Sequence, residues 1–145
     1  MAFIELLEAK QILKLPKIFV IQPKNCCPIV ACWQGGMTAL ESLIFSKTIA
    51  EGTAIKRPIR LTKILDILKK TKGGGLAVKE EEISEATLEL SRKGFFVEPT
   101  CASAAVGLEK LQARNLIGSD DTTVVILTGS GLKSSDFFTE NVALQ

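Results

Sequence analysis

The sequence contains no histidine and no tyrosine. Without histidine the chain cannot form Ser-His-Asp or Cys-His catalytic groups, and most catalytic zinc sites are excluded as well. The side chains that remain for proton transfer are those of Asp, Glu, Lys and Cys. The absence of two residue types therefore removes the commonest forms of nucleophilic and metal-assisted hydrolysis.

Long hydrophobic runs and a strong charge of one sign are also missing. No apolar run approaches the ~20 residues that span a bilayer, and Met1 to Glu5 carry no basic region or cleavage site of a signal peptide. Eighteen basic and 16 acidic residues leave a net charge of +2, so no strong field attracts the chain to nucleic acid. We expect a cytoplasmic protein that binds neither membranes nor nucleic acid.

The four cysteines lack the paired spacing of a structural zinc site, which needs two ~C-x2-4-C pairs. Because no secretory signal is present, we expect reduced thiols. Their simplest interpretation is as small buried hydrophobic residues, with no metal site, at Cys26, Cys27, Cys32 and Cys101.

What is present fits a globular protein: 145 residues, of which 46% are hydrophobic and 23% charged. Apolar periodicity and Pro or Gly breakers predict helices over 3–13, 28–34, 60–71, 80–93 and 101–115. Short apolar runs predict strands at 17–22, 76–78, 95–98 and 123–128. Strands that are apolar on both faces and alternate with helices are typical of parallel sheets. We predict a single α/β domain over 1–145, a three-layer open mainly parallel sheet of about four strands with helices on both faces.

A glycine run and a basic segment could each suggest anion binding, but the sequence around each of them argues against that function. A phosphate cradle runs from strand to glycine loop to helix, whereas the glycines at 73–75 follow a predicted helix and precede a strand. Segment 47–72 holds eight basic and two acidic residues, but it lacks aromatic stacking partners apart from Phe45. A solvated helix face is the better interpretation of this basic segment.

Two polar residues close predicted strands, Glu98 before Pro99 and Thr128 before Gly129. In open α/β sheets, ligands bind beyond the carboxyl ends of the strands. Glu98 and Thr128 are therefore candidate site residues, although a polar residue that caps the next turn would give the same pattern.

Five segments, in this order, carry a resemblance to a known family. They are LPKIFVIQP at 15–23, CPIV at 27–30, TIAEG at 48–52, FVEPT at 96–100 with ASAA at 102–105, and VILTGSGLK at 125–133. Together they resemble the C-terminal part of threonine synthase, a pyridoxal-phosphate enzyme of the tryptophan-synthase-β fold type. The similarity covers nearly all of the chain.

The resemblance implies a cofactor, pyridoxal phosphate, and a small amino-acid substrate. Thr128 matches the hydroxyl residue that bonds the pyridine nitrogen, and Gly129 follows it. A hydroxyl at that place does not hold the nitrogen protonated, which moderates electron withdrawal and suits elimination and replacement. Glu51, Gly52 and Glu98 match family segments near the cofactor ring.

Two parts of the family's site have no counterpart in these residues. One is the lysine that holds the cofactor as a Schiff base, in a Ser-Phe-Lys-Asp type motif, and the other is the glycine loop for the cofactor phosphate. Ser46-Lys47-Thr48 looks like the lysine motif but falls in the TIAEG segment. We therefore assign no catalytic residue and expect no covalent hold on the cofactor by this chain alone.

The resemblance implies a C-terminal piece or half of a threonine-synthase-like lyase, which in complete form converts O-phosphohomoserine to threonine and phosphate. Alternatives are a non-catalytic binding or regulatory module of the same fold, or a piece of a threonine dehydratase or a sulfonate-forming paralogue. The expected partners are a second copy of the chain or a complementary N-terminal half. Phe3, Ile4 and Leu7 are the candidates for part of that interface.

Overall fold

The computed structural model describes residues 2–142 and centres on a small parallel sheet. Strand β1 (Phe19–Pro23) pairs with β2 (Gly74–Val78), in a register that sets Phe19 opposite Gly74 and Pro23 opposite Val78. Because the strands are parallel, their carboxyl ends lie at the same end of the sheet. The candidate functional site lies at that end.

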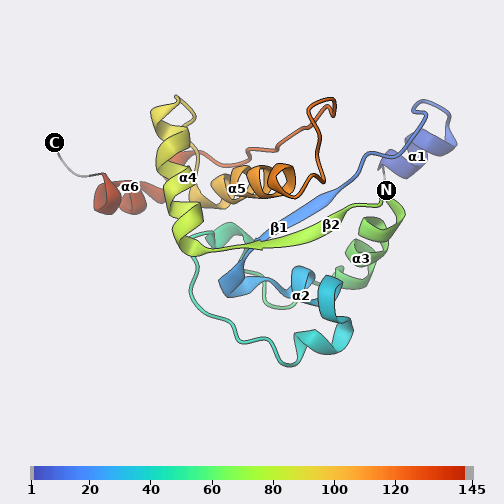
Figure 1. Ribbon diagram of the computed structural model, residues 1–145. Helices are drawn as coiled ribbons and strands as arrows, with labels where there is room; N and C mark the ends of the chain where they lie inside the picture. The colour runs from blue at the N-terminus through green and yellow to red at the C-terminus, as the bar shows by residue number, and fades with distance from the viewer. Residues whose placement is uncertain (1, 143–145) are drawn as a thin grey trace.

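Helices cover both faces of this sheet and produce three layers (Figure 1). Helices α2 (Pro28–Gly35) and α3 (Leu61–Lys70) lie against one face. Helix α5 (Pro99–Ala113) contacts both strands from the other face, and α4 (Glu80–Arg92) packs against α5. The predicted α/β class and the helices on both faces are confirmed.

Helix α2 begins where the sequence predicts it, with Pro28 in its first turn. Cys27 provides no side-chain cap. Instead Gln22 on β1, which is buried, accepts hydrogen bonds from the backbone N–H groups of Ile29 (2.9 Å) and Val30 (3.1 Å). The strand that precedes the helix therefore satisfies its first amides.

The core follows from the apolar stripes of the longer helices. Leu61 and Leu65 on α3 pack with Cys32 on α2. On the other side of the sheet, Ile83 on α4 and Val106 on α5 pack with Val78 at the end of β2. The first cluster lies between α2 and α3, and the second lies between the helices and the end of β2; in both, the 3.6-residue spacing gathers these side chains on one face of each helix.

Short helices lie at both ends of the described residues. Helix α1 (Ala2–Glu8) ends five residues before the predicted limit at Leu13, because Lys10 adopts a left-handed conformation with a φ of 56°. Helix α6 (Ser135–Asn141) follows the last turn. Single turns of 3-10 helix occur at Lys24–Cys26, Met37–Leu40, Glu51–Thr53 and Gly131–Ser134.

The further strands predicted at 95–98 and 123–128 are not part of the sheet, which has two strands among residues 2–142 rather than about four. In this part of the chain, Val97 of the first segment forms an isolated antiparallel bridge with Ser130, which lies just after the second. Apolar β-branched residues favour strands, but a strand also needs a neighbour for its backbone groups. Segment 123–128 has none within residues 2–142, and Val124 is 82% exposed.

Across residues 2–142, no helix combines the length and the apolar character that a membrane crossing requires.

Candidate functional site

Three segments that are far apart in the sequence meet at the N-terminal end of α5. Glu98 occupies the N-cap position of this helix. The turn Glu51–Thr53 contacts the same helix. After α5 the chain returns along the helix (Figure 1) and brings Thr128 and Gly129 back to its first turn. All of the sequence-predicted site residues therefore lie around one helix end.

The sulfur of Cys101, in the first turn of α5, holds the returning segment in place. It accepts hydrogen bonds from the backbone N–H groups of Thr128 (3.0 Å) and Gly129 (2.8 Å). The Thr128 hydroxyl lies 3.4 Å from the same sulfur. Cys101 is buried whereas Thr128 is exposed, so the thiol fixes the backbone while the hydroxyl remains accessible.

Gly129 lies very close to Glu98. The Glu98 N–H donates to the Gly129 carbonyl at 3.1 Å, and a Cβ atom at position 129 would overlap the Glu98 carboxylate. A side chain at this position would displace either the carboxylate or the returning segment. The pair therefore places a half-buried carboxylate next to the residue that follows Thr128.

Gly52 reaches the same helix end from the opposite side. Its N–H donates to the Thr100 hydroxyl at 3.1 Å, and a Cβ at position 52 would lie 3.1 Å from two atoms of that threonine. Glu51 is exposed next to this contact. Glu98, Cys101, Thr128 and Gly129 form one cluster at this helix end, and Glu51 and Gly52 lie at its border. Within the described residues, no hydrogen bond joins Glu51 or Gly52 to Thr128 or Glu98.

A carboxylate on α4 fixes the segment that leads into Glu51. One oxygen of Glu80 accepts from the Thr48 hydroxyl (3.0 Å) and from the Ile49 N–H (2.8 Å). Ala50, the next residue, is fully buried against Val78 at the end of β2. The cluster therefore lies at the carboxyl end of the sheet, where ligands bind in open α/β folds.

The end of a helix of this length provides an electrostatic setting for a polar ligand. The aligned peptide dipoles of α5 give this end a positive partial charge. The Glu98 and Glu51 carboxylates bring negative charge to the same place. This arrangement can orient a polar ring or an amino-acid substrate through hydroxyl, carboxylate and amide groups.

All four cysteines are free and buried, as the sequence predicts. Burial raises the pKa of the Cys26 thiol and of the Cys27 thiol, so both stay protonated at neutral pH. Within residues 2–142, no cluster of potential metal ligands forms. The two perturbed thiols lie before α2, outside the cluster around α5.

Sequence reasoning missed two members of this cluster, Thr100 and Cys101. It treated Cys101 as a small buried hydrophobic residue, which describes its burial and omits the hydrogen bonds of its sulfur. The available signal was its position three residues after Glu98, which places both on the first turn of one helix.

Comparisons with known proteins cover most of the chain. Residues 2–129 match the family model described as pyridoxal-phosphate dependent enzyme. The chain is 38% identical over 120 residues to threonine synthase of Methanosarcina acetivorans, covering 82% of this chain and 30% of that protein. It is 39% identical over 124 residues to threonine synthase of Methanocaldococcus jannaschii, covering 85% of this chain and 31% of that protein. It is 32% identical over 124 residues to threonine synthase of Mycobacterium tuberculosis, covering 85% of this chain and 32% of that protein. The chain thus spans about a third of the length of these relatives.

Proposed function

This chain belongs to the pyridoxal-phosphate dependent enzyme family, and on that premise we propose that it forms the pyridine-nitrogen side of a cofactor site. The observation that carries the proposal is the meeting of Thr128, Gly129 and Glu98 at the N-terminal end of α5. The family resemblance assigns these residues to the surroundings of the cofactor ring. Their closeness in space supports that assignment independently of their order in the sequence.

The residues around α5 fit one part of the cofactor. The exposed Thr128 hydroxyl can hydrogen-bond a ring nitrogen, and the backbone behind it is fixed by Cys101. The missing side chain at Gly129 leaves room for the Glu98 carboxylate at the same helix end. Within residues 2–142, no lysine side chain is hydrogen-bonded or ion-paired to this cluster. The proposal therefore covers the orientation of the ring by this chain.

The activity we propose for the complete protein is that of a threonine-synthase-like lyase acting on O-phosphohomoserine. When bound, pyridoxal phosphate supplies an electron-withdrawing ring that stabilises negative charge on the substrate. Thr128 would bond the ring nitrogen through a neutral hydroxyl, so that this nitrogen stays unprotonated. Glu98 and Gly129 would hold the ring against the end of α5. A single such hydrogen bond contributes about 0.5–1.5 kcal/mol, and more where its loss leaves a buried group unpaired.

The remaining parts of the site must come from residues outside this chain's cluster. We propose that a complementary segment supplies the lysine and the phosphate loop, since the chain corresponds to 30–31% of its archaeal relatives. That segment would cover the apolar residues Val124 and Ile126, which are 82% and 72% exposed. The exposed Phe3 of α1 is a further candidate for the contact, with its half-buried neighbours Ile4 and Leu7.

The proposal is tested by reconstitution. The chain is mixed with the complementary part of the Methanosarcina relative, and phosphate release from O-phosphohomoserine is measured with and without the cofactor. We expect activity in the mixture and none from either part alone. In that complex, Thr128→Ala should lower activity about tenfold or more while Thr128→Ser retains most of it. Thr139→Ala, which alters a hydroxyl bonded within α6, is the matched control.

Two outcomes would redirect this proposal. Cofactor binding to the complex without phosphate release would favour the non-catalytic binding module. Equal activity of the Thr128→Ala and Thr139→Ala complexes would remove Thr128 from the site.

A cytoplasmic location is also part of the proposal, supported by four cysteines that remain free thiols.

A further inference from the structure

The contact between Cys101 and Thr128 bears on the direction in which the Thr128 hydroxyl points its hydrogen. The Sγ and Oγ1 atoms of the two residues lie 3.4 Å apart, and this distance alone allows either atom to be the donor. Cys101 is 2% exposed and lies in the first turn of α5, whereas Thr128 is exposed. The chain therefore fixes the buried member of the pair, and a ligand reaches the exposed member.

The bonding capacity of the Cys101 sulfur distinguishes the two directions. A thiol has one hydrogen to donate, and its sulfur has two lone pairs and is a weak acceptor. The backbone N–H groups of Thr128 and Gly129 donate to this sulfur at 3.0 and 2.8 Å, so both lone pairs have a partner. What remains for the Thr128 hydroxyl is the hydrogen of the thiol, which makes Cys101 the donor and the Thr128 oxygen the acceptor.

Two other acceptors lie near the thiol, and the Thr128 oxygen is closer than both. The Gly129 carbonyl lies 3.5 Å from the sulfur and already accepts the Glu98 N–H at 3.1 Å. A carboxylate oxygen of Glu98 lies 4.0 Å from the sulfur. Among residues 2–142, the Thr128 hydroxyl has no hydrogen-bond partner besides Cys101. The thiol hydrogen and the hydroxyl oxygen therefore satisfy each other.

A hydroxyl that accepts a hydrogen bond from the chain keeps its own hydrogen for a ligand. A pyridine nitrogen without a proton is an acceptor, so it takes the hydrogen that the Thr128 hydroxyl offers. A protonated pyridine nitrogen is a donor and needs an acceptor, so it competes with the Cys101 thiol for the same Thr128 oxygen. The contact behind Thr128 thus distinguishes the two protonation states of a bound ring.

We propose that Cys101 is a positioning residue that makes the Thr128 hydroxyl a hydrogen-bond donor and thereby selects a cofactor ring with an unprotonated nitrogen. Two hydrogen bonds follow one another, from the Cys101 thiol to the Thr128 oxygen and from the Thr128 hydroxyl to the ring nitrogen. No proton is transferred, because the thiol and the hydroxyl both keep their hydrogens. This inference rests on the cofactor site proposed above and adds the residue that sets its preference.

The first measurement uses the full chain without the cofactor. Hydrogen exchange of the Thr128 and Gly129 amides is followed by NMR in the native protein and in the Cys101→Ala and Cys101→Ser variants. We expect roughly tenfold faster exchange in Cys101→Ala, because both amides lose their acceptor. Cys101→Ser should stay close to the native protein, since a hydroxyl can replace the thiol as acceptor and donor. Equal exchange in Cys101→Ala and the native protein would overturn the proposal.

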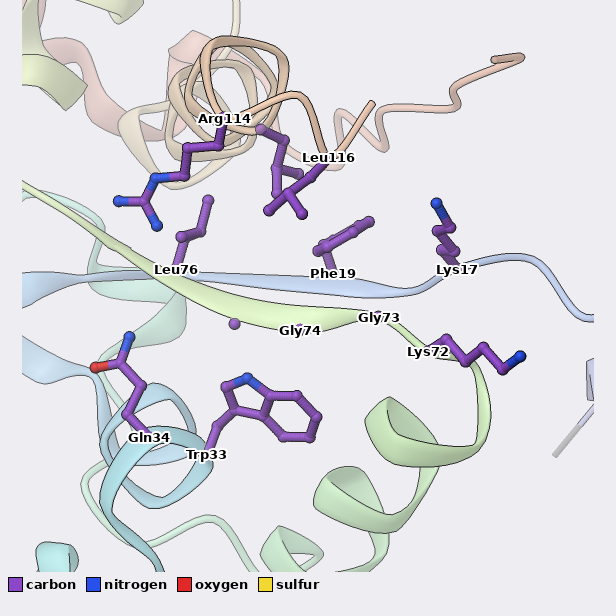
Figure 2. A pocket seen from close by; sticks show the side chains of 12 residues that line it. Lys17, Phe19, Trp33, Gln34, Lys72, Gly73, Gly74, Leu76, Arg114 and Leu116 are labelled. Carbon is purple, nitrogen blue, oxygen red and sulfur yellow. The ribbon is translucent and has the colours of Figure 1, made fainter. Parts of the chain in front are cut away.

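Cys26→Ala is the matched control, because Cys26 is also 2% exposed and lies before α2, outside the cluster. It should leave the exchange of the Thr128 and Gly129 amides unchanged. The chain contains one tryptophan, Trp33, which lines a pocket of about 310 Å³ where β1 and β2 begin (Figure 2). That pocket lies at the end of the sheet away from Cys101. Trp33 fluorescence in a urea titration therefore shows separately that each variant is folded.

The second measurement uses the complex with the complementary part of the Methanosarcina relative, loaded with pyridoxal phosphate that carries ¹⁵N in its ring. The ¹⁵N chemical shift is followed against pH, because it reports whether the ring nitrogen carries a proton. In the Cys101→Ala complex, this nitrogen should take up a proton at a pH about one unit higher than in the native complex, because the freed Thr128 oxygen can accept from a protonated ring. The Cys101→Ser complex should restore the native behaviour.

Failure of this proposal and failure of the cofactor site give different results. If Thr128→Ala changes the protonation of the ring nitrogen and Cys101→Ala does not, the role of Cys101 is refuted and the site stands. If neither substitution changes it, or if no complex binds the cofactor, both proposals are refuted. A change in Cys101→Ala that Cys101→Ser does not reverse would show a purely structural residue and would also overturn the proposal.

Discussion

Replacement of Gly107 by alanine sets two well-known effects against each other. Gly107 lies in the middle of α5 and is buried against Ile21 of β1. A Cβ at position 107 would overlap the Cγ1 and Cδ1 atoms of Ile21. The glycine therefore sets how closely α5 approaches the sheet, and with it the position of the Glu98 end of the helix.

Helix propensity and packing predict opposite signs for this substitution. Alanine is favoured over glycine in a helix interior by about 1 kcal/mol. Overpacking of a core contact costs about 1–3 kcal/mol. Because several atoms of one side chain overlap, we expect the packing cost to exceed the propensity gain by about 1–2 kcal/mol. With an m-value near 2 kcal/mol/M, the urea midpoint should fall by about 0.5–1 M.

A double-mutant cycle separates the two effects. Ile21→Ala removes the overlapping atoms, so Gly107→Ala should be neutral or stabilising in that background, with a coupling of at least about 1 kcal/mol. Ala105→Gly on the same helix measures the local difference in propensity. The reasoning is refuted if Gly107→Ala raises the midpoint in the native background, or if the two substitutions are additive.

Two further predictions concern the ends of the helices. Gly129→Ala should displace the Glu98 carboxylate that its Cβ would overlap. Because this carboxylate ends a flexible side chain that can turn aside, we expect a loss of only about 1 kcal/mol in unfolding free energy by urea titration. An unchanged urea midpoint would contradict the contact. The hydrogen bond from Lys110 at 2.7 Å holds the pKa of Glu82 below its ordinary value. The stabilisation from this ion pair is complete above about pH 5 and is lost as the pH falls through the lowered pKa of Glu82. In the Glu82→Gln variant, the free energy of unfolding should therefore decline less steeply as the pH is lowered. Parallel plots of unfolding free energy against pH for the variant and the native protein would argue against this role.

The helices were predictable because their signals are local. Apolar residues three and four positions apart fixed α3 at Leu61, Leu65 and Leu68, and Pro99 marked the start of α5. Strands depend on partners that the local pattern does not contain. Segment 123–128 has a strong strand pattern and stays unpaired, because a neighbouring strand is absent from residues 2–142.

The candidate site and the pocket at the opposite end of the sheet differ in how far the sequence revealed them. The resemblance identified Thr128, Glu98 and Gly52, which the structure brings to one helix end, and the comparisons confirm the resemblance itself. The role of these residues stays a prediction. The pocket of about 310 Å³ where β1 and β2 begin was not predictable, because its lining comes from helix ends and strands that share no motif.

The parallel pairing of β1 with β2 has a consequence for the order of folding. Phe19 pairs with Gly74, which lies 55 positions later in the chain. Closing that loop costs about 2 kcal/mol more chain entropy than closing a four-residue hairpin, whereas α4 and α5 are adjacent in sequence and can associate early.

During synthesis at ~5–20 residues per second, β1 therefore waits roughly 3–11 s for its partner strand to emerge. Throughout that interval its apolar residues are exposed to other nascent chains. Charged residues beside an apolar strand act as gatekeepers against such encounters. Lys14 and Lys17 before β1, and Lys24 after it, are placed to protect the unpaired strand until the sheet closes.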